Sequence, residues 1–142
     1  MDATSAPAEV RARVAAGRTP ITVWLFIVLS WALGWWMAFD GLHERVFGDY
    51  IRINGQLGPW AGLAQSAGID PSRLGFTFVA VGLGLIGASF GVYLRRRWGY
   101  TAGLLLLAAS LLYLGFGTPL ALICIVCLLL RPTRAYLVPP LV

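Results

Sequence analysis

The sequence has no lysine and little charge of any kind. Charged residues make up 12% of its 142 residues, whereas an ordinary soluble domain carries about 25%. Hydrophobic residues reach 58%, and the mean hydropathy is +0.77. So short a chain has too few polar residues to cover a soluble core, and its composition is the opposite of that of a disordered chain. The composition excludes both classes and predicts an integral membrane protein.

Histidine and cysteine, the usual ligands of redox and metal centres, are also scarce. With His43 as the one histidine, bis-histidine haem ligation within the chain is excluded, and the C-x-x-C-H haem motif is absent. The expected spans carry no Asp, Glu, His, Lys or Arg, which disfavours proton relays and ion transport. The glycine-rich segment that starts at Gly82 follows no soluble strand, so a nucleotide-binding loop is not expected. We therefore expect no cofactor, no metal site and no enzymatic activity.

Long uncharged runs predict an all-α protein with four transmembrane helices, each needing about 20 mostly apolar residues. The last uncharged run, 98–130, is too long for one crossing and contains a Gly-Phe-Gly-Thr-Pro break, which favours a hairpin of two spans. The alternative has three spans and a re-entrant last segment. In chain order we predict an N-terminal tail at 1–20, a span at 21–39, a connection at 40–73, a span at 74–94, an arginine loop at 95–97, a span at 98–114, a turn at 115–118, a span at 119–130 and a C-terminal tail at 131–142.

The arginines predict the orientation of these spans. Four spans place eight arginines on one side, in both tails and the 95–97 loop, and three on the other side, in the acid-containing connection. Because cytoplasmic loops carry the excess of basic residues, both termini are expected in the cytoplasm of a bacterium with the protein in its inner membrane. The net charge of +5 is thereby accounted for as an orientation signal, and no nucleic-acid partner is expected.

Short helices are expected outside the spans. The first apolar run is expected to be a membrane span and not a cleaved signal peptide. The segment 8–18 that precedes it is a candidate basic helix. In the connection, Leu42, Val46, Tyr50 and Ile51 recur at the spacing of one helix face (i, i+4, i+8, i+9). This spacing predicts an amphipathic helix lying on the membrane surface. Pro59–Ala67 is a second candidate, and Asp70 is expected to cap the next span. The acids of this connection are expected to be solvated.

Small residues in the second expected span predict close helix packing. They form a G-x-x-x-G pattern and a neighbouring stripe with a spacing of four residues, and small residues let helix backbones approach each other in lipid. The packing residues are Ala80, Gly84, Gly87, Ala88 and Gly91.

Tryptophans in the first span form a second candidate surface. Trp24, Trp31 and Trp35 share one stripe of the helix and are expected to face lipid or a partner helix. Trp35 and Trp36 near one end, with Trp98 and Tyr100 near the other, are typical of the aromatic belts at membrane interfaces.

Cys124 and Cys127 form a C-x-x-C pair within the last expected span. With four spans and this pair, the chain is similar to the quinone-linked disulfide oxidoreductases, including the vitamin K epoxide reductase type. That resemblance implies a redox-active pair at Cys124 and Cys127. Those enzymes also use a second cysteine pair on the oxidising side, which this sequence lacks, and the burial expected within a span favours two inert packing cysteines.

The sequence therefore predicts a non-catalytic accessory or scaffold subunit of a larger bacterial membrane complex. Its partners would be membrane lipids and other integral membrane subunits, contacted through the glycine and tryptophan faces. One alternative is a small carrier of an apolar ligand such as a lipid, quinone or pigment, with a cavity lined by Trp31, Trp35 and Tyr113. The other is a thiol-disulfide oxidoreductase that uses Cys124 and Cys127.

Overall fold

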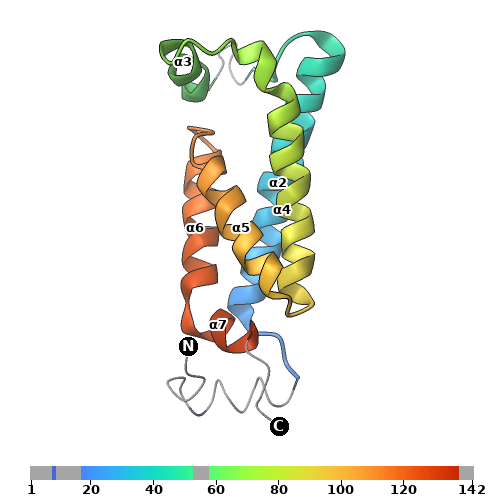
Figure 1. Ribbon diagram of the computed structural model, residues 1–142, viewed down its shortest axis with the longest axis vertical. Helices are drawn as coiled ribbons and strands as arrows, with labels where there is room; N and C mark the ends of the chain where they lie inside the picture. The colour runs from blue at the N-terminus through green and yellow to red at the C-terminus, as the bar shows by residue number, and fades with distance from the viewer. Residues whose placement is uncertain (1–7, 9–16, 53–57, 138–142) are drawn as a thin grey trace.

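The fold is an all-α bundle in which two long helices pack against a shorter helical hairpin (Figure 1). It is taken from a computed structural model that describes residue 8 and residues 17–52 and 58–137. Within those ranges the helices are α2 (Ile21–Phe47), α3 (Pro59–Ser66), the 3₁₀ helix η2 (Pro71–Leu74), α4 (Gly75–Tyr93), α5 (Arg97–Ser110), α6 (Gly117–Leu129) and α7 (Arg131–Leu137), and they include no strand. Most of the segment 8–18, where the sequence predicts a basic helix, lies outside the described residues.

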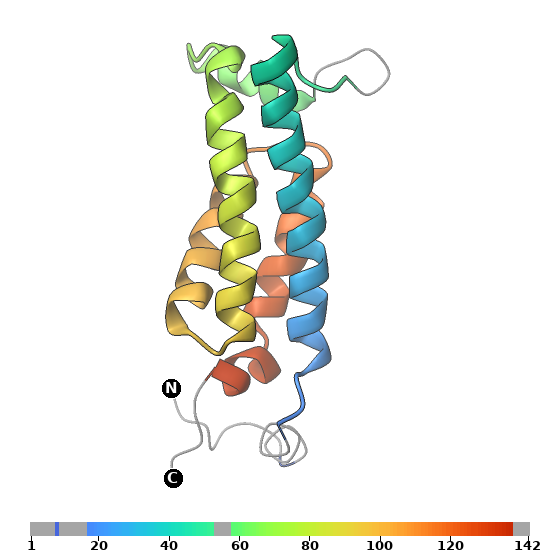
Figure 2. The same cartoon turned by 90° about the vertical axis from the view of Figure 1, so that its right-hand side faces the viewer.

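Helices α2 and α4 are antiparallel and lie side by side along their full length (Figures 1 and 2). At 1.5 Å per residue, the 27 residues of α2 extend about 40 Å, and the 23 residues of Pro71–Tyr93 about 35 Å. Both exceed the roughly 30 Å of a hydrocarbon core. These two helices are long and apolar enough to cross a membrane.

The hairpin helices α5 and α6 are shorter than the long pair, with 14 and 13 residues or about 20 Å each. Helix α6 continues into α7 after a bend of 61°, and this bent pair is the third candidate span. The structure thus supports two to three spans. Helix α6, at the fourth predicted span, is long enough only together with α7, and α5, at the third predicted span, is too short to be a candidate by itself.

Helix α3 covers the tip of the short hairpin (Figure 1). It occupies the segment where the sequence predicts a short helix, and its Pro59 is in the first turn, as Pro71 is in η2. The Asp70 side chain accepts a hydrogen bond from the Ser72 backbone N–H, which confirms the predicted cap. This bond lowers the pKa of Asp70. Helix α3 and the hairpin together reach about as far along the bundle as the long helices do.

The first span differs from its expected end at Phe39. Helix α2 continues through Asp40 and Gly41 to Phe47, and a left-handed Gly48 (φ 73°) ends it with a bond to the Glu44 carbonyl oxygen. The expected separate surface helix from Leu42 is therefore the last part of α2. Asp40 and Glu44, expected to be solvated, are 2% and 3% exposed. The expectation that the spans hold no ionisable group is corrected by these two residues.

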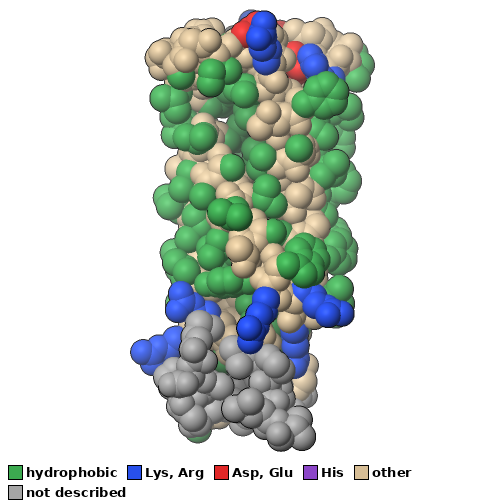
Figure 3. Space-filling view, in the orientation of Figure 1, with side chains coloured by type: hydrophobic (Ala, Val, Ile, Leu, Met, Phe, Trp, Pro, Cys, Tyr) green, Lys and Arg blue, Asp and Glu red, His purple; other side chains and the backbone are tan. Residues whose placement is uncertain are grey.

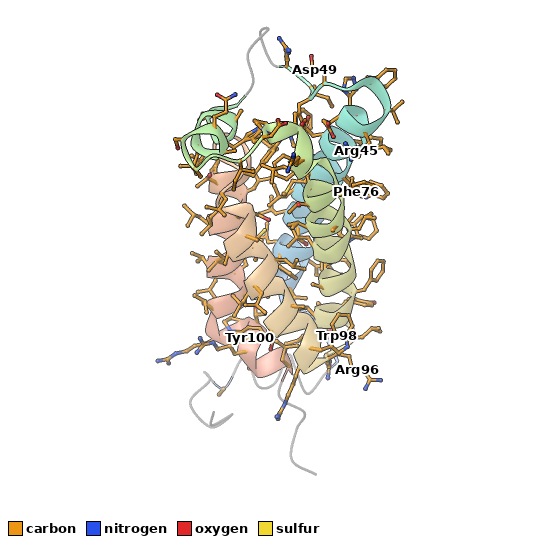
Figure 4. The ribbon with its side chains drawn as sticks, turned by 45° about the horizontal axis from the view of Figure 1, so that its top comes forward. Arg45, Asp49, Phe76, Arg96, Trp98 and Tyr100 are labelled. Atoms are coloured by element: carbon orange, nitrogen blue, oxygen red, sulfur yellow. The ribbon has the colours of Figure 1, made fainter. Side chains whose placement is uncertain are left out.

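Charge divides the molecule into two ends separated by an apolar belt (Figure 3). No acid lies among the described residues at one end, which we name the arginine end. It is defined by six described arginines: Arg18, Arg95, Arg96, Arg97, Arg131 and Arg134. The acidic end carries all four described acids and three arginines: Asp40, Glu44, Arg45, Asp49, Arg52, Asp70 and Arg73. Figure 4 shows Arg45 and Asp49 at the acidic end, with Arg96, Trp98 and Tyr100 at the arginine end. This distribution agrees with the predicted grouping of arginines.

Candidate functional site

A buried polar cluster lies near the acidic end, between α2, the hairpin tip and the segment after α2. The Tyr113 hydroxyl donates to Asp40 Oδ2 at 2.6 Å, and the Trp36 indole N–H donates to the Tyr113 hydroxyl oxygen at 3.1 Å. The second carboxyl oxygen, Oδ1, accepts from the Ile51 backbone N–H at 2.8 Å. Asp40 thereby joins three segments that are distant in sequence. We name Asp40, Tyr113, Trp36 and Ile51 the Asp40 cluster.

Tyr113 of this cluster also belongs to a group of four aromatic rings on the side of α3. Trp60 stacks on Tyr113 at a centroid distance of 5.9 Å and meets Tyr50 and Phe78 edge-on at 4.7 and 4.9 Å. The Tyr50 hydroxyl donates to the Pro71 carbonyl oxygen at 2.5 Å. Burial raises the pKa of Tyr50 well above its usual range, and the nearby carboxyl groups of Glu44 and Asp40 raise it further. The four rings hold α3 against the bundle.

Glu44 is buried one turn after Asp40, against the start of α4. Its Oε2 accepts from Arg45 Nε at 3.0 Å, and it lies against Gly75, where any side chain would collide with it. The Arg45 guanidinium stacks over the Phe76 ring at 4.9 Å from its centroid (Figure 4). Within the described ranges, no three His, Cys, Asp or Glu side chains gather as a metal site. Asp40 positions helices, because both of its carboxyl oxygens accept hydrogen bonds from other segments, whereas the donor to Glu44 is its chain neighbour.

The predicted tryptophan stripe divides in the structure. Trp24 and Trp31 line an apolar groove of about 410 Å³ between α2 and α4, which we name the tryptophan groove. Trp31 donates from its indole N–H to Ser89 Oγ at 2.9 Å and packs on Phe90, and Trp24 packs on Tyr93. The complete lining is Trp24, Ile27, Val28, Trp31, Ser89, Phe90 and Tyr93.

The cavity expected from Trp31, Trp35 and Tyr113 is not formed among the described side chains. Tyr113 is buried in the Asp40 cluster, whereas Trp35 is 47% exposed and packs on Phe39. Trp36, which the sequence places only in the interfacial belt, is the tryptophan that reaches Tyr113. On the helical wheel Trp35 and Trp36 are about 100° apart, so only one of them can face the bundle interior.

The predicted packing residues of α4 face two directions. Gly91 lies against Gly99 of α5, Gly84 contacts Leu106, and Ala88 is buried. Ala80 and Gly87 instead face outward, and no atom lies within 4 Å of the Cβ position at Gly87. The G-x-x-x-G pattern therefore does not form one continuous contact.

Two pairs of glycines outside the predicted set bring α2 and α4 together. A Cβ at Gly34 would lie 2.6 Å from the Gly82 carbonyl oxygen, and Gly41 and Gly75 meet in the same way. The two glycines on α2 are seven residues apart, and so are the two on α4. The antiparallel register of the helices therefore brings a glycine of α2 against a glycine of α4 at two points. A search for this i, i+7 spacing within the expected spans would have found Gly75 and Gly82 but not Gly41, which lies beyond the expected end of the first span at Phe39.

Cys124 and Cys127 are free thiols buried on the inner face of α6. The Thr133 hydroxyl donates to the Cys127 carbonyl oxygen at 2.7 Å, and it lies 2.9 Å from the Thr22 hydroxyl oxygen. These contacts connect the bend after α6 to the start of α2. The pair thus packs inside the bundle and does not line the tryptophan groove.

We expect both cysteines to resist alkylation in the folded protein. A maleimide must reach a sulfur as thiolate, and Cys124 and Cys127 are 0% and 5% exposed. Labelling of the native protein, measured by mass shift, should be at least about tenfold slower than labelling after denaturation in dodecyl sulfate. In the native protein a reagent can reach the sulfurs only when the fold opens locally. Rapid labelling of the native protein would instead support the redox alternative.

No family model matches the sequence, and neither a curated protein nor a solved structure matches this chain.

Proposed function

We propose that this protein is a non-catalytic accessory subunit of a larger complex in a bacterial cytoplasmic membrane. The arginine end, which carries both described chain ends, would face the cytoplasm, as the excess of positive charge on that side favours. The partner would be a transmembrane helix of another subunit, which packs across the exposed side of α2 and α4.

The observation that carries this proposal is the outward face of α2. Beyond the tryptophan groove it presents large apolar side chains at intervals of three and four residues: Trp35, Phe39, Leu42 and Val46. Spacings of three and four residues form the seam through which one helix packs on another. On neighbouring α4, outward-facing Ala80 and Gly87 flank Leu83 and leave room for a close approach. Lipid alone requires an apolar surface but no such alternation of bulky and small residues.

A photo-crosslinking amino acid at Leu83 tests this proposal in the membrane of the host cell. Leu83 is 50% exposed between the two small residues, and Leu122 on α6 is equally exposed on a different face. Position 83 should give one discrete protein adduct, and position 122 should give only lipid adducts. Gly87→Ile should reduce the adduct at 83 at least about fivefold, because the added side chain keeps the partner backbone away, whereas its Cβ would meet open space in this chain.

Identification of the adduct by mass spectrometry then names the partner. Lipid adducts alone at both positions, with a monodisperse protein after mild extraction, would refute the accessory function. An adduct that Gly87→Ile leaves unchanged would equally contradict packing across this face.

A carrier of an apolar ligand is the second candidate function, because the tryptophan groove has a volume within the roughly 300–1,000 Å³ of small-molecule sites. A carrier must exchange its ligand, whereas a scaffold need not. Transfer of a groove-bound ligand between two vesicle populations therefore distinguishes them.

A further inference from the structure

Trp24 lines two pockets, one in the apolar belt and one at the arginine end. The first is the tryptophan groove. The second, of about 450 Å³, surrounds the start of α2 and is lined by Arg18, Thr19, Pro20, Ile21, Thr22, Trp24 and Pro132. We name it the Arg18 pocket. Because Trp24 lines both, one molecule with a polar head and an apolar chain could occupy them together.

The Arg18 pocket favours an anion. Arg18 is an exposed cation at its edge, and every described charge at this end of the molecule is an arginine. The pocket also includes Ile21 and Thr22, whose N–H groups lie in the first turn of α2, where helix amides lack intrahelical acceptors. The helix dipole adds positive potential at the same place. Arginine and first-turn amides together are typical donors to phosphate.

The tryptophan groove favours a chain and not a helix as its occupant. Its exposed lining is almost wholly apolar, and the Ser89 hydroxyl already accepts the Trp31 indole N–H. Bulky aromatic rings line it on both sides, whereas a partner helix approaches closely where residues are small. A flexible hydrocarbon chain can follow such a surface.

We infer that one anionic phospholipid binds this chain, with its phosphate beside Arg18 and one acyl chain in the tryptophan groove. The charge of the arginine end and the apolar groove match the two parts of this molecule. The site differs from the partner face around Leu83 and Gly87, and a bound lipid would serve a scaffold as well as a carrier.

The full-length protein in mild detergent provides the test, with lipids counted by native mass spectrometry. The probes are phosphatidylglycerol, phosphatidylcholine with the same acyl chains, and inorganic phosphate. The wild-type protein should retain phosphatidylglycerol in preference to phosphatidylcholine. Arg18→Gln should lower that preference about fivefold, the contribution expected of one arginine beside an anionic headgroup. Val28→Trp, which fills the groove, should reduce retention of both lipids.

Arg73→Gln is the matched control, because it removes one arginine from the acidic end. It should leave retention unchanged, as should Gly87→Ile, so the lipid site and the partner face can fail separately. Equal retention of both lipids by the wild type, or an unchanged preference in Arg18→Gln, would overturn the inference. Displacement of the lipid by millimolar inorganic phosphate would also overturn it, because the pocket would then bind a free anion.

Discussion

Gly34→Val should prevent α2 and α4 from assembling. A Cβ at Gly34 would lie 2.6 Å from the Gly82 carbonyl oxygen and 3.0 Å from Ile86 Cγ1. The first obstacle is backbone within a helix, so it can be relieved only if the two helices separate. Overpacking typically costs about 1–3 kcal/mol and more where the backbone must move, against a total stability of about 5–15 kcal/mol. We expect a loss of at least about 3 kcal/mol, measured as a lower midpoint of thermal unfolding in detergent.

Gly87→Val provides the matched control, since it adds the same side chain to a helix of the same pair. No atom lies within 4 Å of its Cβ position, so its stability should change by less than about 1 kcal/mol. Similar losses in both variants would show that the cost is due to the β-branched residue in a helix and not to the glycine contact. Gly82→Val should resemble Gly34→Val, because its Cβ would lie 2.9 Å from the Ala38 backbone nitrogen.

The sequence predicts the parts of this fold that depend on local chemistry. Pro20 precedes the first helix, Asp70 caps the start of η2, Gly115 lies in the hairpin turn, and Pro119 is in the first turn of α6. Each signal acts within a few residues, so it can be recognised without knowing what lies nearby in space. Hydropathy similarly predicts the two long apolar helices.

Features that depend on distant residues could not be predicted in this way. Asp40-Gly41 resembles the end of a span, because a charge followed by glycine usually marks one. In the structure Gly41 is instead the contact point for Gly75, and Asp40 accepts hydrogen bonds from Tyr113 and Ile51. Their roles depend on partners up to 73 residues away, so the single sequence carries no local signal for them.

The two pockets also depend on residues that are distant in the sequence. Regular spacing places Trp24 and Trp31 on one helix face, but only the antiparallel register with α4 brings Phe90 and Tyr93 beside them as a groove. The Arg18 pocket requires Pro132 as well, which α7 brings to the start of α2. Spacing within one helix therefore predicts a face, whereas a site needs the second helix.

Asp40→Ala should destabilise the acidic end more than any other single side-chain truncation there. It leaves two donors, the Tyr113 hydroxyl and the Ile51 backbone N–H, without their acceptor in a buried environment. Each unsatisfied buried group costs about 1–3 kcal/mol, so we expect a loss of about 2–6 kcal/mol in the free energy of unfolding. Asp40→Asn keeps an acceptor for Ile51 and should cost roughly half as much. Arg52→Gln, which breaks the exposed ion pair with Asp49, is the control and should cost under about 1 kcal/mol.

A double-mutant cycle separates the bond between Asp40 and Tyr113 from general loss of packing. Tyr113→Phe removes only the hydroxyl and keeps the ring stacked on Trp60. If the two groups act through their 2.6 Å bond, the double variant should be about 1–3 kcal/mol more stable than the sum of the single losses implies. Strictly additive losses would mean that Asp40 stabilises the fold mainly through Ile51. In that case the contacts of Trp60 and Phe78 with the Tyr113 ring would stabilise the hairpin tip, and α3 would contribute to this through Trp60.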